Sequence, residues 1–137
     1  MWVMEKLTLS LTAFVMFAAA TPTRLYAADA WAVPPDAAGL KNPLPGDNGT
    51  LARGKSIFED RCADCHGQKG KGDGPAAADF SPKPGDLTKA AMREQPDGVL
   101  FWKISEGKKP MPPYKSKISE EDRWKLVNYV RTLTAQK

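Results

Sequence analysis

The stretch Cys62-Ala63-Asp64-Cys65-His66 holds both cysteines and the only histidine of the 137-residue chain. A C-x-x-C-H run is the attachment motif of a c-type haem. Two thiols one helical turn apart can each form a thioether to one edge of a porphyrin, and the adjacent imidazole then reaches the iron. The motif therefore predicts one covalent haem c, attached through Cys62 and Cys65, with His66 as an axial ligand of its iron.

Three other uses of these residues compete with haem attachment. A zinc site needs four ligands, or three plus a water, and an adjacent Cys-His pair offers poor tetrahedral geometry with no fourth candidate nearby. A thioredoxin-like thiol pair normally stands near a βαβ pattern, which the sequence lacks. A disulfide between Cys62 and Cys65 would close a very small loop and constrain little. Haem attachment is the favoured interpretation, and thiol–disulfide exchange is its main alternative.

An apolar run near the start of the chain, residues 7–20, has the length of a signal-peptide core and is short for a bilayer span. We expect residues 1–27 to be a signal peptide, with cleavage after Ala27 or Ala28. Because c-type haem is attached outside the cytoplasmic membrane, a periplasmic location is expected. An uncleaved segment would instead anchor the protein to the outer face of that membrane.

The next segment, residues 28–49, is rich in Pro, Gly, Ala and Asp and cannot form a helix or a central strand. We expect an extended arm there, either pinned to the body by Trp31 and the Asn42-Pro43 step or left as a disordered tether. The remaining domain, residues 50–137, is small for a self-sufficient apolar core, and a haem would supply a large apolar plate.

Apolar spacing and capping residues indicate an all-α domain of three to four short helices, with long loops wrapped around the haem. The expected helices span residues 50–60, 86–95, 97–105 and 120–133. Their expected N-caps are Thr50, Asp86, Asp97 and Ser119, and Gly107 is expected to end the third helix. The Gly- and Pro-rich loop between the first two helices, residues 67–85, is long for a small domain, so we expect the haem to order it.

The second axial position decides what such a haem can do. An open position would permit ligand binding or oxygen chemistry, whereas a filled one restricts the protein to electron transfer. After removal of the signal peptide, two methionines remain, Met92 and Met111. Met92 falls in an expected helix, where methionine is usually core filler. Met111 stands between Pro110 and Pro112, in a loop with largely fixed dihedral angles, and is the expected ligand.

Over residues 51–133 the chain resembles the class I, mitochondrial-type cytochromes c in a bacterial secreted form. Gly54 and Phe58 resemble positions of the family's N-terminal helix, where a glycine allows close helix crossing, and Leu126 and Tyr129 resemble the partner positions of its C-terminal helix. This resemblance implies the cytochrome c fold and one-electron transfer.

Two further matches concern the haem ligands. Gly74-Pro75 resembles the family's Gly-Pro step after the haem motif, and Met111-Pro112 resembles its methionine loop. The resemblance implies that the Pro75 carbonyl accepts a hydrogen bond from His66 Nδ1 and so fixes the tautomer and orientation of the ring.

The expected function is that of a one-electron carrier between extracytoplasmic redox partners, and the protein is not expected to be an enzyme. Two alternatives remain open: a haem-bearing subunit of a larger oxidoreductase, and a haem enzyme or sensor with an open or labile sixth position. No candidate distal His or Arg stands out for cleaving an O–O bond.

The charge of the chain bears on its partners. The formal charge is +4, or +3 without residues 1–27, and two haem propionates bring the total near neutrality. The sequence contains no nucleic-acid-binding motif. A set of lysines near the motif and the methionine loop would steer an acidic redox partner if it rings the haem edge, and its alternative role is ordinary solubilising charge. These are Lys69, Lys71, Lys103, Lys108, Lys109, Lys115 and Lys117.

Overall fold

The structure, a computed structural model, describes residues 31–135. The all-α prediction is confirmed: the described residues form five α-helices and two 3-10 turns and no strand, with an isolated bridge between Lys108 and Met111. No helix in this part of the chain is long and apolar enough to cross a membrane. The expected signal peptide, residues 1–27, lies outside the described residues.

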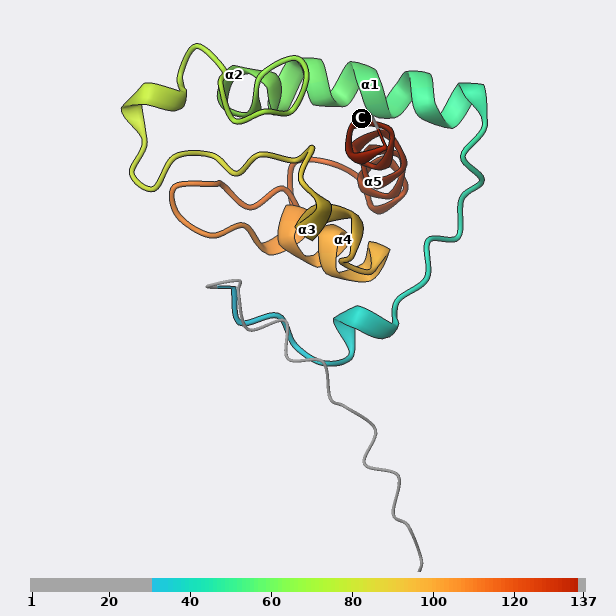
Figure 1. The fold of residues 1–137 in the computed structure, drawn as a ribbon. Coiled ribbons are helices and arrows are strands. Elements are labelled where there is room, and N and C mark those ends of the chain that lie inside the picture. The colour runs from blue at the N-terminus through green and yellow to red at the C-terminus, as the bar shows by residue number, and fades with distance from the viewer. Residues whose placement is uncertain (1–30, 136–137) are drawn as a thin grey trace, which may run out of the picture.

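The two longest helices, α1 (Asn48–Arg61) and α5 (Glu120–Thr134), cross one another at close range (Figure 1). A β-carbon on Gly54 would lie 2.2 Å from the Lys125 carbonyl oxygen and 2.9 Å from Tyr129 Cβ. Beside this contact the rings of Phe58 and Tyr129 pack with centroids 5.3 Å apart. Gly54 therefore permits a backbone-to-backbone approach that any other residue would prevent, as the sequence resemblance implied.

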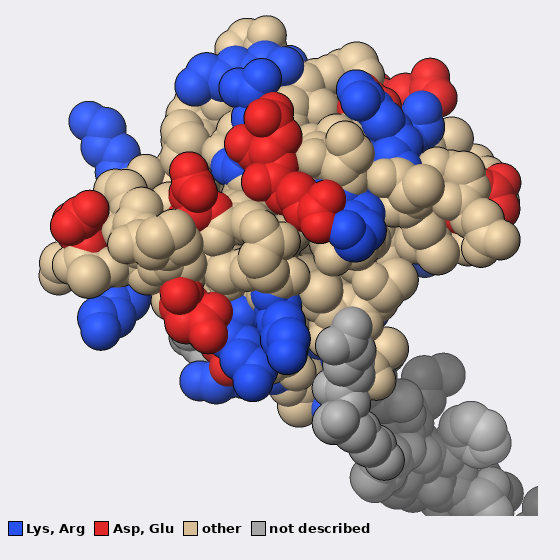
Figure 2. Space-filling model, turned by 90° about the horizontal axis from the view of Figure 1, so that it is seen from above, with Lys and Arg blue, Asp and Glu red and all other residues tan. Residues whose placement is uncertain are grey.

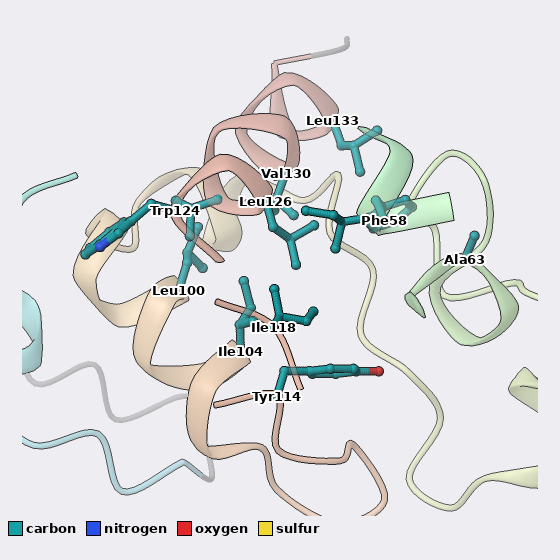
Figure 3. Packing of buried hydrophobic residues seen from close by; sticks show 12 residues of the cluster. Phe58, Ala63, Leu100, Ile104, Tyr114, Ile118, Trp124, Leu126, Val130 and Leu133 are labelled. Carbon is teal, nitrogen blue, oxygen red and sulfur yellow. The ribbon is translucent and has the colours of Figure 1, made fainter. Parts of the chain in front are cut away.

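The core lies between this pair of helices and α4 (Asp97–Glu106), as Figure 3 shows. Phe58, Leu126 and Val127 are its most deeply buried large side chains. Phe101 of α4 stacks on Trp124 of α5 at 3.9 Å between ring centroids. The other buried members are Ile57, Ala63, Leu100, Ile104, Tyr114, Ile118, Val130 and Leu133. One apolar cluster thus joins the helices to the loop that precedes α5.

Three of the expected helices are present, but two of their caps differ from the prediction. Asp47, not Thr50, caps α1, and its carboxylate accepts a hydrogen bond from the Thr50 amide at 2.8 Å. Pro96, not Asp97, precedes α4; Asp97 is the first residue of the helix, and its carboxylate pairs with Arg131 of α5 at 2.7 Å. The Ser119 cap of α5 is confirmed at 3.2 Å from its hydroxyl to the Asp122 amide. Gly107 ends α4 as predicted, with φ +62°.

The prediction of a helix over residues 86–95 is largely wrong. Only α3 (Ala90–Arg93), a single turn, forms there. Asp86 instead accepts hydrogen bonds from the amide and hydroxyl of Thr88, at 2.8 and 2.6 Å. Such a local Asx turn offers the backbone an alternative to the helix and delays its start.

The N-terminal arm lies against the helical body rather than extending from it (Figure 1). Its 3-10 turn η1 (Ala37–Gly39) packs on α4, where a β-carbon on Gly98 would lie 2.0 Å from the Ala37 carbonyl oxygen. Trp31 meets Trp102 edge-on, with 6.4 Å between ring centroids. Further along, Asn42 donates to the Asn128 side chain of α5 at 2.8 Å.

Replacing Gly54 by alanine should destabilise the protein by roughly 2–4 kcal/mol, because the new methyl group meets the α5 backbone, which cannot yield as a flexible side chain would. Thermal unfolding of the haem-loaded protein measures the loss. Gly49→Ala is the matched control in the same helix, since its β-carbon would have only an ordinary contact of 3.6 Å with Asp47. Equal melting temperatures for the two variants would contradict the packing argument.

Candidate functional site

The attachment motif forms a one-turn helix, α2 (Ala63–His66), that continues directly from α1. Cys62 joins the two helices: its amide donates to the Phe58 carbonyl at 2.9 Å, and its carbonyl accepts from the His66 amide at 2.8 Å. The Cys65 amide also donates to the Cys62 carbonyl, at 3.1 Å. Both cysteines and the histidine therefore lie within one short helical segment, as the spacing of the motif predicted.

The two thiols are free and half-buried. Burial raises the pKa of Cys62 to about 12, with smaller contributions from Cys65 and Asp60. Thiol–disulfide exchange depends on a thiolate with a lowered pKa, so this environment does not favour that alternative. Within residues 31–135 no group of three His, Cys, Asp or Glu side chains could hold a metal ion. The donor set here is two thiols and one imidazole.

The imidazole of His66 is held by the loop that follows it. Its Nδ1 lies 3.1 Å from the Gly85 carbonyl oxygen. A carbonyl only accepts, so Nδ1 carries the proton and Nε2 keeps its lone pair. Burial lowers the pKa of His66 from 6.5, and the hydrogen bond to Gly85 opposes that shift in part. The ring is thereby held as a neutral imidazole with one nitrogen available to a metal.

The predicted partner of His66 was the Pro75 carbonyl, and the structure places Gly85 there instead. Pro75 is exposed and lines an open hollow of about 500 Å³ beside Lys69 and Lys71. Its neighbours bind the carbonyls of α2: the Gly74 amide donates to Cys65 at 3.2 Å, and the Ala76 amide donates to Asp64 at 2.9 Å. The segment around Pro75 thus wraps the backbone of α2, while a later part of the loop meets the ring.

A glycine-rich turn brings Gly85 to the ring. Gly72 has φ +75°, its amide donates to the His66 carbonyl at 2.7 Å, and a β-carbon on it would lie 2.4 Å from the Pro84 carbonyl oxygen. Close by, the Leu87 amide donates to the Gly70 carbonyl at 2.7 Å. The loop expected to be ordered by the haem therefore has hydrogen bonds of its own. Sequence reasoning missed Gly85, and the signal that could have found it is the Pro84-Gly85 step, a dipeptide typical of turns.

The two candidate methionines are both half-buried and both pack against the apolar cluster, but they come from different elements. Met92 is half-buried on α3, and its sulfur accepts a hydrogen bond from Gln95 Nε2 at 3.4 Å. Met111 is half-buried in the loop between α4 and α5, and it packs at the edge of the apolar cluster, as Cys62 also does. Met92 packs against the same cluster, and it differs from Met111 in that its sulfur already accepts a hydrogen bond from a side chain.

The residues at this edge of the cluster fit a covalent haem. The donor set contains two free thiols and one oriented neutral imidazole. Apolar side chains that pack against the same cluster as Cys62, including Leu87 and Phe101, are only partly buried and so have surface left to cover a porphyrin. An apolar plate with covalent and nitrogen attachment is the cofactor that this combination of groups would take.

The predicted lysine set needs one correction. Lys103 is only 9% exposed, and its Nζ donates to Gln95 Oε1 at 2.8 Å and lies 5.6 Å from the Trp31 ring centroid. It belongs to the contact between α4 and the arm and is not part of an exposed ring of charge. The remaining six lysines of that set are exposed. On the face seen in Figure 2, basic and acidic side chains are intermixed.

Substituting Gly72 by alanine should displace the Pro84-Gly85 segment and weaken the hydrogen bond to His66, because the methyl group would meet the Pro84 carbonyl and φ is positive there. In the reduced haem-loaded protein, the NMR signal of the His66 Nδ1 proton should exchange with solvent at least about tenfold faster than in the parent protein. Gly46→Ala, where a β-carbon meets nothing within 4 Å, should leave the exchange unchanged. An unchanged rate in Gly72→Ala would refute the role of this turn.

Comparison with known proteins agrees with this chemistry. A chain of the Kuenenia stuttgartiensis reducing HAO-like protein complex is 29% identical, with a TM-score of 0.59 over 69% of the present chain. The match covers 49% of that other chain, so the present chain spans about half its length. No curated protein matches the sequence. Residues 49–130 match the family described as cytochrome c oxidase, cbb3-type, subunit III; the chain belongs to this family and is a c-type cytochrome, with haem c as its cofactor.

Proposed function

We propose that the protein is a one-electron carrier with a single haem c, attached through Cys62 and Cys65 and ligated by His66 and Met111. One observation carries this proposal. The anchored imidazole of His66 leaves Nε2 available on the same short helical segment as both thiols, and Cys62 of that segment packs against the same apolar cluster as Met111. Family membership supports the haem and electron transfer, and ligation by His66 and Met111 is the part that we propose.

When bound, haem c takes up and releases one electron at its iron, and methionine ligation favours the reduced form. The two cysteines fix the position of the group along α2. The Gly85 carbonyl holds the His66 ring in one orientation and one tautomer, so little rearrangement accompanies a change of charge. Apolar side chains such as Ile104 and Ile118 exclude water, which disfavours the more highly charged oxidised state and raises the potential.

Within the c-type cytochromes we favour the class I, mitochondrial-type subclass. The close crossing of α1 and α5 at Gly54 supports it, as does the proline-rich loop that carries Met111. The carrier is proposed to work in the periplasm after loss of residues 1–27, or at the outer face of the cytoplasmic membrane if that segment is retained.

A second candidate is a permanent subunit of a larger oxidoreductase. The similar solved structure is part of a multi-protein complex, and the present chain corresponds to about half of that chain. The electron-transfer chemistry is the same in both proposals. They differ in whether the haem domain diffuses between partners or stays bound to one.

An acidic redox partner, or an anionic probe, should react faster at low salt. The haem-loaded protein, with its two propionates, is near electroneutrality. The salt dependence of the reaction rate therefore reports local lysines such as Lys109 rather than net charge. Oxidation by hexacyanoferrate should slow on the order of threefold between about 10 and 200 mM ionic strength, and a cationic cobalt complex should show the opposite trend. Lys109→Gln should flatten the slope, whereas Lys55→Gln, which removes a lysine paired with Glu59 on α1, should not. Equal slopes for the two probes would exclude local steering.

Replacing Met111 by alanine should abolish the far-red sulfur-to-iron absorption band of the oxidised protein. An optical redox titration should show the potential falling by roughly 0.1–0.3 V, within the about 0.8 V that axial ligation spans. Met92→Leu is the matched control and should keep both the band and the potential, because its sulfur is already bonded to Gln95. A band lost only in Met92→Leu would move the ligand to Met92. A high-spin parent spectrum would favour the enzyme or sensor alternative.

A further inference from the structure

The loop that carries Met111 is fixed on both sides of that residue. On the N-terminal side, the Met111 amide donates to the Lys108 carbonyl at 2.8 Å, and the Lys108 amide donates back to the Met111 carbonyl at 3.0 Å. On the C-terminal side, the Tyr114 amide lies 3.2 Å from the Ile104 carbonyl and 3.1 Å from the Ser105 carbonyl, both in the last turns of α4. The methionine therefore closes a tight turn on its N-terminal side and lies three residues from a point anchored to α4, Tyr114, on its C-terminal side.

The chain between Met111 and Tyr114 is stiff. Pro112 and Pro113 each have a φ fixed by the ring, and a residue that precedes a proline is itself confined to extended conformations. Few dihedral angles in this stretch can change. A displacement of Tyr114 is consequently transmitted to Met111 rather than absorbed between them.

Tyr114 links this loop to the haem-attachment turn. Its ring is 9% exposed, and its hydroxyl donates to the Arg61 carbonyl at 2.9 Å. Arg61 is the last residue of α1 and directly precedes Cys62. Burial, together with the neighbouring Cys62 and Cys65, raises the pKa of Tyr114 to about 12. The hydroxyl therefore remains a protonated donor at neutral pH.

The segment around Tyr114 is also held from the far side. The buried guanidinium of Arg123 in α5 donates from Nε to the Ile118 carbonyl at 3.2 Å and from a terminal nitrogen to the Ser105 hydroxyl. Tyr114 thus stands where a frame built from α4 and α5 meets the end of α1. Its hydroxyl joins the methionine loop to the residue next to Cys62.

We propose that Tyr114 is a positioning residue for Met111. Its hydrogen bond to the Arg61 carbonyl holds the methionine loop at a set distance from the attachment turn and so protects the methionine–iron bond from competing ligands. This inference rests on the proposed ligation by His66 and Met111. The oxidised state is the sensitive one, because methionine favours the reduced form.

The test is a titration of the oxidised haem-loaded protein with imidazole. Loss of the far-red sulfur-to-iron band measures how much methionine has been displaced at each concentration. Tyr114→Phe removes the hydroxyl and keeps the buried ring, so the fold is retained. It should bind imidazole about fivefold more tightly than the parent protein, the equivalent of one ordinary hydrogen bond lost from the methionine-bound state.

Tyr129→Phe is the matched control, since its half-buried ring packs on Phe58 at the crossing of α1 and α5 rather than in the methionine loop. It should leave imidazole affinity unchanged, and thermal unfolding of both variants separates loop positioning from general stability. An affinity within twofold of the parent in Tyr114→Phe, or an equal gain in Tyr129→Phe, would overturn the inference. A parent protein without the band, or a Met111→Ala variant that keeps it, would instead overturn the proposed ligation.

Discussion

The backbone contact between α1 and α5 at Gly54 is the constraint on which the rest of the structure depends. Because α1 runs directly into Cys62, and α5 begins just after the methionine loop, their crossing sets how the attachment turn and that loop face one another. Burial of apolar side chains such as Phe58 and Val127 stabilises the crossing. The nearby pair of Arg53 and Asp122 is partly exposed and contributes little by comparison.

The polar side chains buried in this small core have hydrogen-bond partners. No buried side-chain nitrogen or oxygen among the described residues lacks a hydrogen-bond partner. Arg123 illustrates the principle: its guanidinium lies 4.6 Å from the Phe101 ring centroid and binds a carbonyl and a hydroxyl. Hydrogen bonds are directional, so these satisfied buried groups fix the orientation of the segments around the methionine loop. Apolar packing alone would not achieve this.

The arm adds a layer outside the region that matches the family. Ala37 is buried against α4, and Asn42 reaches α5, so residues from before α1 help to cover both later helices. A domain of about a hundred residues buries a smaller fraction of its surface than a larger domain does, and such a strap increases that fraction. The charge of Lys103 is enclosed in the same contact, between Gln95 and Trp31.

Much of this arrangement was predictable from the sequence because the signals are local. The spacing within Cys62-Ala63-Asp64-Cys65-His66 specifies its chemistry regardless of the fold, and the apolar period and serine cap of residues 119–133 specify a helix. The role of Gly54 was implied by the family resemblance, and it depends on the absence of a side chain where two helices cross.

The tertiary structure alone decided the partners that are distant in sequence. Several carbonyls in the loop after His66 could have met its ring, and the turn at Gly72 brought Gly85 there in place of Pro75. Lys103 and Tyr114 likewise owe their environments to segments far along the chain, Trp31 in one case and Arg61 in the other. A Gly- and Pro-rich loop has no periodic pattern, and hydrogen-bond geometry varies over tenths of an ångström, so these contacts exist only once the helices have packed.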